Sequence, residues 1–427
     1  MDFTKAIKEV EKARKILIVS HYDCDGLCSA KILSTALQRE GKDIEIKIVK
    51  ELSEDIIKEI ESLERDLTIF SDLGSGYLNL LPKKEKIIVL DHHTPESFEI
   101  SNNIIHINPT IEGKELCGSG ICYFFVSKFS NNKDLVDYVI VGAIGDNQLE
   151  IGENIKLKEE AEKLGRLKIE KGLKIFGHVN RPLHESLRTS RIFPLDNHSQ
   201  IVQFLSELEI NLISNGKIKS YYDLTKEEKK KLILGIIKER IRNDFGEHSD
   251  LVSNIYILTY QPKKLMDALE YSTILNAFGR LKKYKEALEL MEGKLELLDE
   301  VLQEYRKKIA SYLEWITKNM NNFYEVNDTI FINAKDNIDP NLIGTIASIF
   351  INTFTDKKVV VALAYDNNEI KVSARAKREV NLDEILNKIC KEIGGLGGGH
   401  KQAAGAKIPK EKEVDFIKYF VKYIEKF

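Results

Sequence analysis

The sequence lacks several features that would place it in a class at once. Its five cysteines form no CxxC pair, and it has a single tryptophan in 427 residues. No apolar run approaches the ~18 residues that a transmembrane helix needs, and the longest, YVIVGAIG, is far shorter. No secretory signal precedes the cysteines. We therefore expect a cytoplasmic protein with reduced, mostly buried thiols and no membrane partner.

The chain also lacks a large net charge. Its 64 Lys and Arg residues against 67 Asp and Glu residues give a formal net charge of −3, so it is not a generally basic nucleic-acid coat. Nucleic-acid binding would need local patches. Residues 156–193 and residues 371–412 each carry ten basic residues against five acidic ones. Each stretch is either such a patch or a solvated lysine-rich face, and its composition fits both.

The first 150 residues alternate short apolar runs with amphipathic segments. This rhythm predicts a mainly parallel sheet covered by helices on both faces. In open sheets of this kind, ligands bind beyond the carboxyl ends of the strands. The runs that we predict as strands are 15–20, 44–49, 67–72, 86–91 and 103–108.

The rest of the chain is first helical and then mixed. Residues 225–241 predict a helix capped by Thr225, and residues 263–319 predict two or three packed helices or one long connector. Near the carboxyl terminus, VVVALAYD (359–366) and EIKVSARA (369–376) predict a hairpin, which a helix at about 382–393 follows.

The length of the chain predicts more than one domain. We expect an α/β protein with a cleft between two lobes. Its three predicted parts are an N-terminal parallel-sheet domain at 1–190, a helical insertion and connector at 191–325, and a smaller C-terminal α/β domain at 326–427.

The first predicted strand runs directly into HYDCDG, where His21, Asp23 and Asp25 occupy every second position. If the strand continued, these three side chains would face one side and Cys24 the other. Gly26 would then allow a sharp turn into the following helix. The motif by itself fits either a polar turn or a functional site.

Further acidic and histidine residues follow other predicted elements. Asp72 ends a strand in FSDLGSG, and Asp146 follows a small-residue run in VGAIGDN. A single aspartate in such a place is usually a cap or turn former. The run Asp91, His92 and His93 in VLDHHTP is harder to explain as a turn, and it favours a functional site.

This succession of HxDxDG, a strand-end Asp, DHH and a GxxGD-like Asp resembles the DHH phosphoesterase superfamily. At the other end, GGLGGGHKQAAG (394–405) and KVSARA (371–376) resemble the substrate-binding domain that accompanies DHH domains. STILNAFGRL (272–281) is similar to the NAxGR segment of RecJ-like nucleases, and GHVNRPLHESL (177–187) resembles their archaeal members. NIDPNLIGTIASIF (337–350) stands where RecJ-like proteins carry an HPGVIGIVAS-type segment, without its histidine and first glycine.

The resemblance implies a centre of two metal ions. Its ligands would be His21, Asp23, Asp25, Asp72, His92 and Asp146. The first two would hold one ion, Asp25, His92 and Asp146 the other, and Asp72 both. The aspartates among them carry −4 formally, which two divalent ions balance. Mainly oxygen ligands with one imidazole per ion favour manganese, with magnesium as a substitute, over zinc.

The resemblance also implies the roles of the remaining site residues. Asp91 would orient a histidine, and His93 would reach the scissile phosphate or assist proton transfer. Water activated by the ions would attack phosphorus in line. The substrate-binding residues would be Ser373, Arg375, Gly397, Gly398, Gly399, His400 and Arg280.

The resemblance and the long helical middle favour a RecJ-like hydrolase, an exonuclease that degrades single-stranded DNA or RNA from an end. Its setting would be DNA replication, DNA repair or RNA turnover, and its partner a replisome protein such as GINS. Tyr221, Tyr222 and Phe278 are candidate aromatics for base stacking. The alternatives are a nanoRNase or dinucleotide phosphodiesterase, and a noncatalytic replisome scaffold. The sequence leaves the choice of DNA or RNA and the direction of degradation open.

Overall fold

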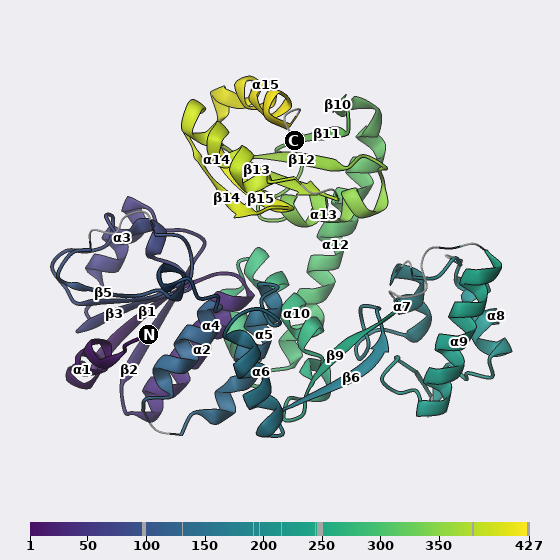
Figure 1. Ribbon diagram of the computed structural model, residues 1–427, viewed down its shortest axis with the longest axis horizontal. Coiled ribbons are helices and arrows are strands. Elements are labelled where there is room, and N and C mark those ends of the chain that lie inside the picture. Colours follow the sequence, from purple (N-terminus) through teal and green to yellow (C-terminus); the bar gives the residue numbers. More distant parts are fainter. Residues whose placement is uncertain are drawn as a thin grey trace. The chain divides into compact units, whose positions relative to one another are not determined.

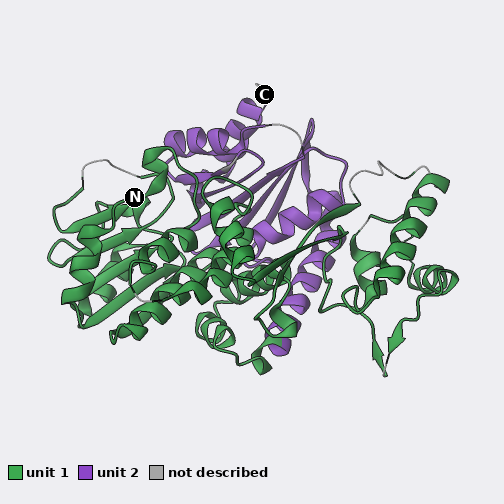
Figure 2. Cartoon of the chain, turned by 60° about the horizontal axis from the view of Figure 1, so that its bottom comes forward, with its two compact units in different colours: residues 1–298 green, residues 299–427 purple. Residues whose placement is uncertain are grey.

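The computed structural model divides into two compact units, residues 1–298 and residues 299–427 (Figure 2). The first unit contains the N-terminal sheet and most of the helical middle, so the three-part division at 190 and 325 remains a prediction. The structure describes residues 1–95, 100–129, 131–190, 192–195, 197–214, 216–243, 245, 251–377 and 380–424, with the side chain of His400 outside the description.

The first unit begins with the predicted parallel sheet, whose strand order is β2-β1-β3-β4-β5 (Figure 1). Its strands are β1 (Lys15–His21), β2 (Asp43–Val49), β3 (Leu67–Ser71), β4 (Ile87–Leu90) and β5 (Ile104–Ile107). The helices of this part are α1 (Thr4–Lys12), α2 (Cys24–Arg39), α3 (Glu54–Ser62), α4 (Gly118–Val126), α5 (Val136–Gly145) and α6 (Asn154–Lys163), with short 3₁₀ turns at Ser75–Tyr77, Pro109–Glu112 and Lys133–Leu135.

The central strands are apolar because helices or loops cover both faces of the sheet. Leu17 and Val19 on β1 pack into one core with Phe70 and with residues of α3. On β1 the neighbouring residue Ile18 points the other way by strand alternation. Helix α2 packs against β1, α4 and α5. The carboxyl ends of β1, β3 and β4 therefore open onto the start of α2.

The middle of the chain forms its own helical group, which strands β6 (Leu167–Leu173) and β9 (Val252–Leu258) connect to the rest of the unit as an antiparallel pair (Figure 1). The group contains α7 (Leu183–Ser190), α8 (His198–Glu207), the short pair β7 (Ile213–Ser214) and β8 (Lys217–Ile218), and α9 (Lys226–Arg242). It has an apolar core of its own. As predicted, Thr225 caps α9, through a reciprocal capping box with Glu228.

Three separate helices follow, which answers the open question about residues 263–319. They are α10 (Ala268–Arg280), α11 (Tyr284–Met291) and α12 (Glu296–Asn319), after a 3₁₀ turn at Lys263–Leu265. Asp267 begins α10 by accepting hydrogen bonds from the backbone N–H groups of Leu269 and Glu270.

Tyr221 and Phe278 are 2% and 0% exposed, so these two candidates for base stacking were wrong: both side chains pack into the core.

The second unit is built on a six-stranded sheet of order β10-β11-β12-β13-β15-β14, antiparallel except for the β11–β12 pair. Its elements are β10 (Tyr324–Val326), β11 (Thr329–Lys335), α13 (Ile343–Thr353), β12 (Val359–Asp366), β13 (Glu369–Ala376), α14 (Leu382–Ile393), β14 (Leu396–His400), β15 (Ala403–Pro409) and α15 (Glu413–Ile424), with 3₁₀ turns at Met320–Asn322 and Lys410–Lys412. The predicted hairpin and the helix at 382–393 are confirmed.

Strand β12 shows how one sequence serves two cores. Val359, Val361 and Leu363 pack with α14 and α15 on one face. Val360 and Ala362 pack with α13 and the end of α12 on the other. All eight residues of β12 except the last two are buried. Covered on both faces, the strand is apolar throughout.

All five cysteines are buried and unpaired, as predicted. Among the residues that the structure describes, none of the helices is both long and apolar enough to span a bilayer.

Candidate metal centre

The HYDCDG motif contains the junction between a strand and a helix. His21 is the last residue of β1, Asp23 is the N-cap of α2, and Asp25 lies in the first helical turn. The expectation of one strand with alternating side chains was therefore wrong. The helix starts at Cys24 because the carboxylate of Asp23 accepts a hydrogen bond from the backbone N–H of Gly26 over 3.0 Å.

Asp72 follows β3 with a backbone φ of +57°, which is uncommon for a residue with a side chain. Its carboxylate is 1% exposed and lies between two imidazoles. Oδ1 is 3.1 Å from Nε2 of His92, and Oδ2 is 3.5 Å from Nδ1 of His21. This backbone turn places one carboxylate at the centre of the candidate site.

Asp91, at the end of β4, organises the loop that carries the two histidines. Oδ2 accepts a hydrogen bond from Ser75 N over 2.8 Å, and Oδ1 accepts one from His92 N over 2.8 Å. Oδ1 is also 2.7 Å from Nδ1 of His93. Asn108 closes the loop by donating to the backbone carbonyl of His93 over 2.7 Å. Because Asp91 occupies Nδ1, the Nε2 edge of the His93 ring is the one left for a ligand. The His93 side chain is 54% exposed.

Asp25 is held by the start of α4, 93 positions further along the chain. Oδ2 accepts from Gly118 N over 2.6 Å, and Oδ1 accepts from Ser119 N over 3.1 Å and from the Ser119 hydroxyl. A Cβ at Gly142 would lie 2.4 Å from Asp25 Oδ1. Glycines on two helices thus make room for one buried carboxylate.

Asp146 follows the last residue of α5 and faces His92. Its Oδ2 is 3.4 Å from His92 Nε2, and Gln148 donates to the same oxygen over 3.3 Å. Asn147, between them, has a φ of +58°. The tight turn at the end of α5 brings the Asp146 carboxylate back toward the carboxyl edge of the sheet.

The structure therefore brings the six predicted ligands together from separated segments. Their donor atoms form two groups in which all atoms lie within 4.8 Å of one another. Each group has two carboxylates and one imidazole. The groups are His21, Asp23 and Asp72, and Asp25, His92 and Asp146.

The electrostatics of the site fit cations. Burial and then the charges of Asp72 and Asp146 raise the pKa of Asp25 well above its ordinary value. Burial and the charge of Asp72 likewise raise the pKa of Asp146 to about 6. Among the described residues, the buried atoms Asp72 Oδ2 and His21 Nδ1 have no hydrogen-bond partner of good geometry. Divalent cations would relieve the repulsion and satisfy these atoms.

In the second unit, Ser373 and Arg375 lie on β13 beside the start of α13. Arg375 Nε donates to Ser348 Oγ over 2.8 Å. A Cβ at Gly344 would lie 2.9 Å from Ser373 Oγ and 3.0 Å from Arg375 Nη2. The NIDPNLIGTIASIF segment, although it departs from the RecJ-like pattern, therefore packs directly against both predicted substrate-binding residues.

The predicted glycines Gly397, Gly398 and Gly399 form most of β14, the edge strand of its sheet. They pair with β15, and Gly399 has a φ of +145° and packs against Ala404. An edge strand of glycines leaves backbone groups open to a ligand on its unpaired side. The predicted contact of His400 lies outside the described residues.

Arg280 is the last residue of α10, four residues after Asn276 and therefore on the same side of that helix. Asn276 Oδ1 accepts a hydrogen bond from Cys24 N over 3.1 Å. A Cβ at Gly279 would lie 2.1 Å from the carbonyl oxygen of Tyr22. The NAFGR segment thus supports the strand–helix junction that carries Asp23 and Asp25.

Several of these supporting residues escaped prediction from the sequence. Their shared property is that they position ligands through tertiary contacts: Gly118, Ser119, Gly142, Gln148 and Asn276. Gly142 and Asn276 lie inside the quoted VGAIGDN and STILNAFGRL segments, but those patterns do not assign the contacts of either residue. Gly118 and Ser119 lie in the CGSG run at 117–120, where α4 begins. That run indicates a crowded helix start and does not name the residue that it contacts.

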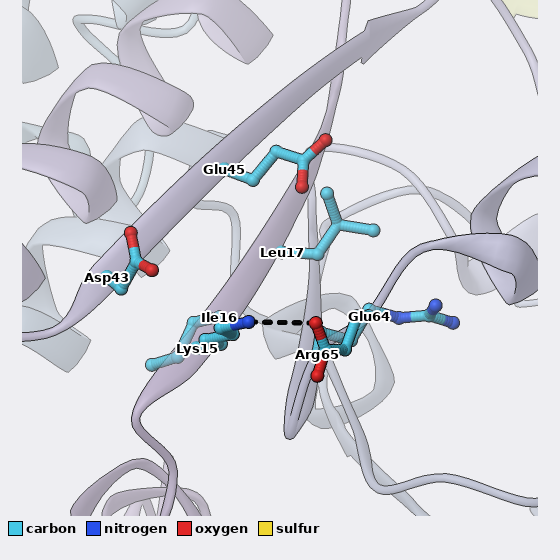
Figure 3. A pocket seen from close by; sticks show the side chains of 7 residues that line it. All are labelled: Lys15, Ile16, Leu17, Asp43, Glu45, Glu64 and Arg65. Atoms are coloured by element: carbon cyan, nitrogen blue, oxygen red, sulfur yellow. Dashed lines mark hydrogen bonds and ion pairs between the residues drawn. The ribbon is translucent and has the colours of Figure 1, made fainter.

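A separate pocket lies at the opposite edge of the N-terminal sheet (Figure 3). It is lined by the amino-terminal residues of β1 and β2, and Lys15 forms an ion pair with Glu64 over 2.9 Å. None of the candidate ligands lines it. It is therefore distinct from the metal centre, which lies at the carboxyl edge as expected for a parallel sheet.

Known protein families match this chain near both of its ends. Residues 15–143 match the DHH family, N-terminal domain, and residues 327–426 match the DHHA1 domain. The uncharacterized protein MJ0831 of Methanocaldococcus jannaschii is 30% identical over 442 residues, covering 97% of this chain and 95% of that protein. The single-stranded-DNA-specific exonuclease RecJ of Bacillus subtilis is 22% identical, with 95% of this chain but only 45% of RecJ covered.

Solved structures share the fold. RecJ of Thermus thermophilus in complex with Mn²⁺ has a TM-score of 0.63 at 17% identity, covering 99% of this chain and 54% of RecJ. CDC45 of Entamoeba histolytica has a TM-score of 0.62 at 13% identity, and the match covers 98% of this chain and 97% of CDC45. This chain thus spans about half of each of the two RecJ proteins. It belongs to the DHH family and combines a DHH domain with a DHHA1 domain in a RecJ-like fold.

Proposed function

We propose that this protein is a metal-dependent exonuclease that hydrolyses phosphodiester bonds of single-stranded DNA or RNA from an end. The observation that carries the proposal is the pair of ligand groups that meet at the buried carboxylate of Asp72. Further support comes from the Bacillus subtilis relative, which is a single-stranded-DNA-specific exonuclease. Membership of a phosphoesterase family agrees with a hydrolase.

Two divalent ions, manganese or magnesium, fit these residues. His21 and Asp23 would hold one ion, Asp25, His92 and Asp146 the other, and Asp72 both. Bound there, the ions supply an acidified water and positive charge for the phosphoryl oxygens during in-line attack. RecJ of Thermus thermophilus is itself known in complex with Mn²⁺ and with Mg²⁺.

The side chains around the ligands orient them and the substrate. Three donors on α4 fix Asp25 before any ion binds, which lowers the cost of ordering the ligand. Asp91 holds Nδ1 of His93, so that the exposed Nε2 edge can donate to a phosphate oxygen or to the leaving group. His93 is thus the proposed catalytic histidine, and Asp91 its positioning residue.

We propose that the second unit binds the substrate backbone. Arg375 offers a planar guanidinium beside Ser373, and the glycine strand β14 offers backbone groups. His400 and Arg280 are proposed as further phosphate contacts. Recognition through phosphates would suit single strands of any sequence, in replication, repair or RNA turnover. A replisome protein of the GINS type remains the proposed partner.

A noncatalytic scaffold is the second candidate, because the likeness to CDC45 is as close in fold as the likeness to RecJ. The intact set of six ligand side chains argues against it. A dinucleotide phosphodiesterase would share the metal centre and differ in substrate length.

One experiment separates these functions. DNA and RNA single strands and a dinucleotide, labelled at either end, are incubated with the protein and Mn²⁺, with and without chelator, beside the Asp72→Ala variant. The proposal expects stepwise shortening of long strands from one end, which chelator or Asp72→Ala abolishes. Cleavage of the dinucleotide alone would favour the small-substrate enzyme. No cleavage by the unaltered protein would favour the scaffold.

A further inference from the structure

The helical group in the middle of the chain contains a second cluster of metal-ligating side chains, far in sequence from the DHH motifs. His184 and Glu185 lie in the first turn of α7, and His198 is the first residue of α8. One donor atom from each of the three residues lies within 4.8 Å of the other two. We propose that this cluster binds a zinc ion, which ties α7 to α8.

The contacts of the cluster leave donor atoms available to a cation. The rings of His184 and His198 are edge to face with centroids 4.7 Å apart. Glu185 Oε2 accepts from both Nε and Nη2 of Arg188, at 3.1 and 2.8 Å. That pairing fixes the carboxylate while Oε1 stays 3.8 Å from His184 Nε2. This distance is longer than a hydrogen bond, so His184 does not occupy the Glu185 oxygen.

His184 itself shows an incomplete set of partners. The residue is 9% exposed, and its buried Nδ1 has no hydrogen-bond partner among the described residues. A buried imidazole nitrogen without a partner is costly. A neutral ring keeps one nitrogen lone pair for a metal.

The ligand chemistry selects the ion. Two imidazoles and one carboxylate are a ligand set that zinc takes in proteins, with water in the fourth position. This differs from the DHH centre, where carboxylates outnumber imidazoles in each group. The two clusters therefore sort different metals by donor type, nitrogen for zinc and oxygen for manganese or magnesium.

The position of the cluster gives the ion a structural role. Helices α7 and α8 both contribute to the apolar core of the helical group, through Leu183, Leu187, Ile201 and Phe204 among others. A shared ion would join the amino-terminal turns of both helices. Because the unfolded chain does not hold the three ligands together, zinc binding stabilises the folded group. This inference is independent of the nuclease activity proposed for the DHH centre.

Zinc binding to the full chain tests the inference. Chelator-treated protein is titrated with ZnCl₂ by calorimetry in excess Mg²⁺, which would occupy the proposed DHH centre, and its melting temperature is followed in parallel. The variants are His198→Gln and Glu185→Gln. The control is Glu227→Gln, which breaks another exposed i,i+3 ion pair, that with Lys230 on α9.

We expect the unaltered protein and the control to bind zinc with similar affinity and to melt at a higher temperature with zinc. Both ligand variants should bind zinc at least tenfold more weakly and lose the rise in melting temperature, while still folding without zinc. If zinc binding is absent, or equally strong in His198→Gln and Glu185→Gln, the inference is overturned.

Discussion

Asp72 Oδ1 lies 3.1 Å from His92 Nε2, although the two residues follow different strands and Asp72 adopts a left-handed backbone conformation. This contact joins the two groups of candidate ligands, because Oδ2 of the same carboxylate faces His21. Removing the Asp72 charge should therefore affect both proposed ion sites at once.

Asp72→Asn should lower metal-dependent strand cleavage by roughly a hundredfold or more, because a bridging ligand charge is worth several kcal/mol in such centres. Asparagine tolerates the positive φ, so the fold should persist. In metal-free buffer the free energy of unfolding should change little, because repulsion from Asp25 and Asp146 is relieved while attraction to His92 is lost. Chemical denaturation and end-labelled strands measure the two effects. Unchanged cleavage would contradict the bridging role.

Gly142→Ala should damage the same centre although it replaces none of the candidate ligands. The new Cβ would lie 2.4 Å from Asp25 Oδ1 and 2.3 Å from Ser119 Oγ, so Asp25 must shift. We expect a stability loss of about 1–3 kcal/mol from overpacking and a weaker affinity for Mn²⁺. Gly76→Ala is the control, because nothing lies within 4 Å of its added Cβ. Equal Mn²⁺ affinity in both variants would refute the account of Gly142.

His93→Gln should separate chemistry from metal binding. His93 is held by Asp91 and lies outside the two ligand groups described above, although its donor atom is also within 4.8 Å of those of Asp72, Asp91 and His92. We expect kcat to fall by about 10²-fold, the usual range for a general acid or a charge-stabilising donor, with Mn²⁺ stoichiometry unchanged. Glu227→Gln, an exposed residue of α9 outside the ligand groups, should retain full kcat. A loss of bound Mn²⁺ in His93→Gln would show that His93 is a ligand instead.

Arg375→Lys should raise KM for long strands by about tenfold, the effect of losing one charge-assisted hydrogen bond, because lysine cannot reproduce the planar fork. The metal centre in the other unit should bind Mn²⁺ as before. Arg306→Lys, on the exposed side of α12, provides the matched control. If KM is equal in both variants, Arg375 does not bind the substrate.

His178 should make stability depend on pH. Burial acts to lower the pKa of His178, but the hydrogen bond and charge of Asp267, 3.0 Å away, outweigh it and raise the pKa. A raised folded pKa stabilises the fold below the unfolded value of about 6.5 and loses that contribution as pH rises through the folded pKa. The gap in melting temperature between the unaltered protein and His178→Gln should therefore be larger at pH 6 than at pH 9. A constant gap would disprove this.

Local patterns in the sequence were sufficient for the strands, and the resemblance to the DHH superfamily supplied the candidate ligands. The hairpin of β12 and β13 and the helix α14 follow directly from alternating and helical hydrophobic periods. The HYDCDG, FSD and LDHH signals lie at the ends of β1, β3 and β4, which a parallel sheet gathers at one edge. These features depend on neighbouring residues, which a single sequence displays.

The geometry inside the site could not be predicted in this way. Strand alternation placed Asp23 and Asp25 on one strand face, whereas the cap at Asp23 starts a helix and turns Asp25 toward Gly118. That partner is 93 positions away, and no local rule pairs the two. Likewise, Phe278, which was a candidate for base stacking, is fully buried in the core. Tertiary packing decided each case.

Anomalous diffraction from a crystal of the full chain soaked in MnCl₂ would show directly whether the six side chains bind manganese. We expect two anomalous peaks ~3.5–4 Å apart on either side of Asp72, one beside His21 and one beside His92. A single peak remote from Asp72, or none where these six side chains meet, would contradict this expectation.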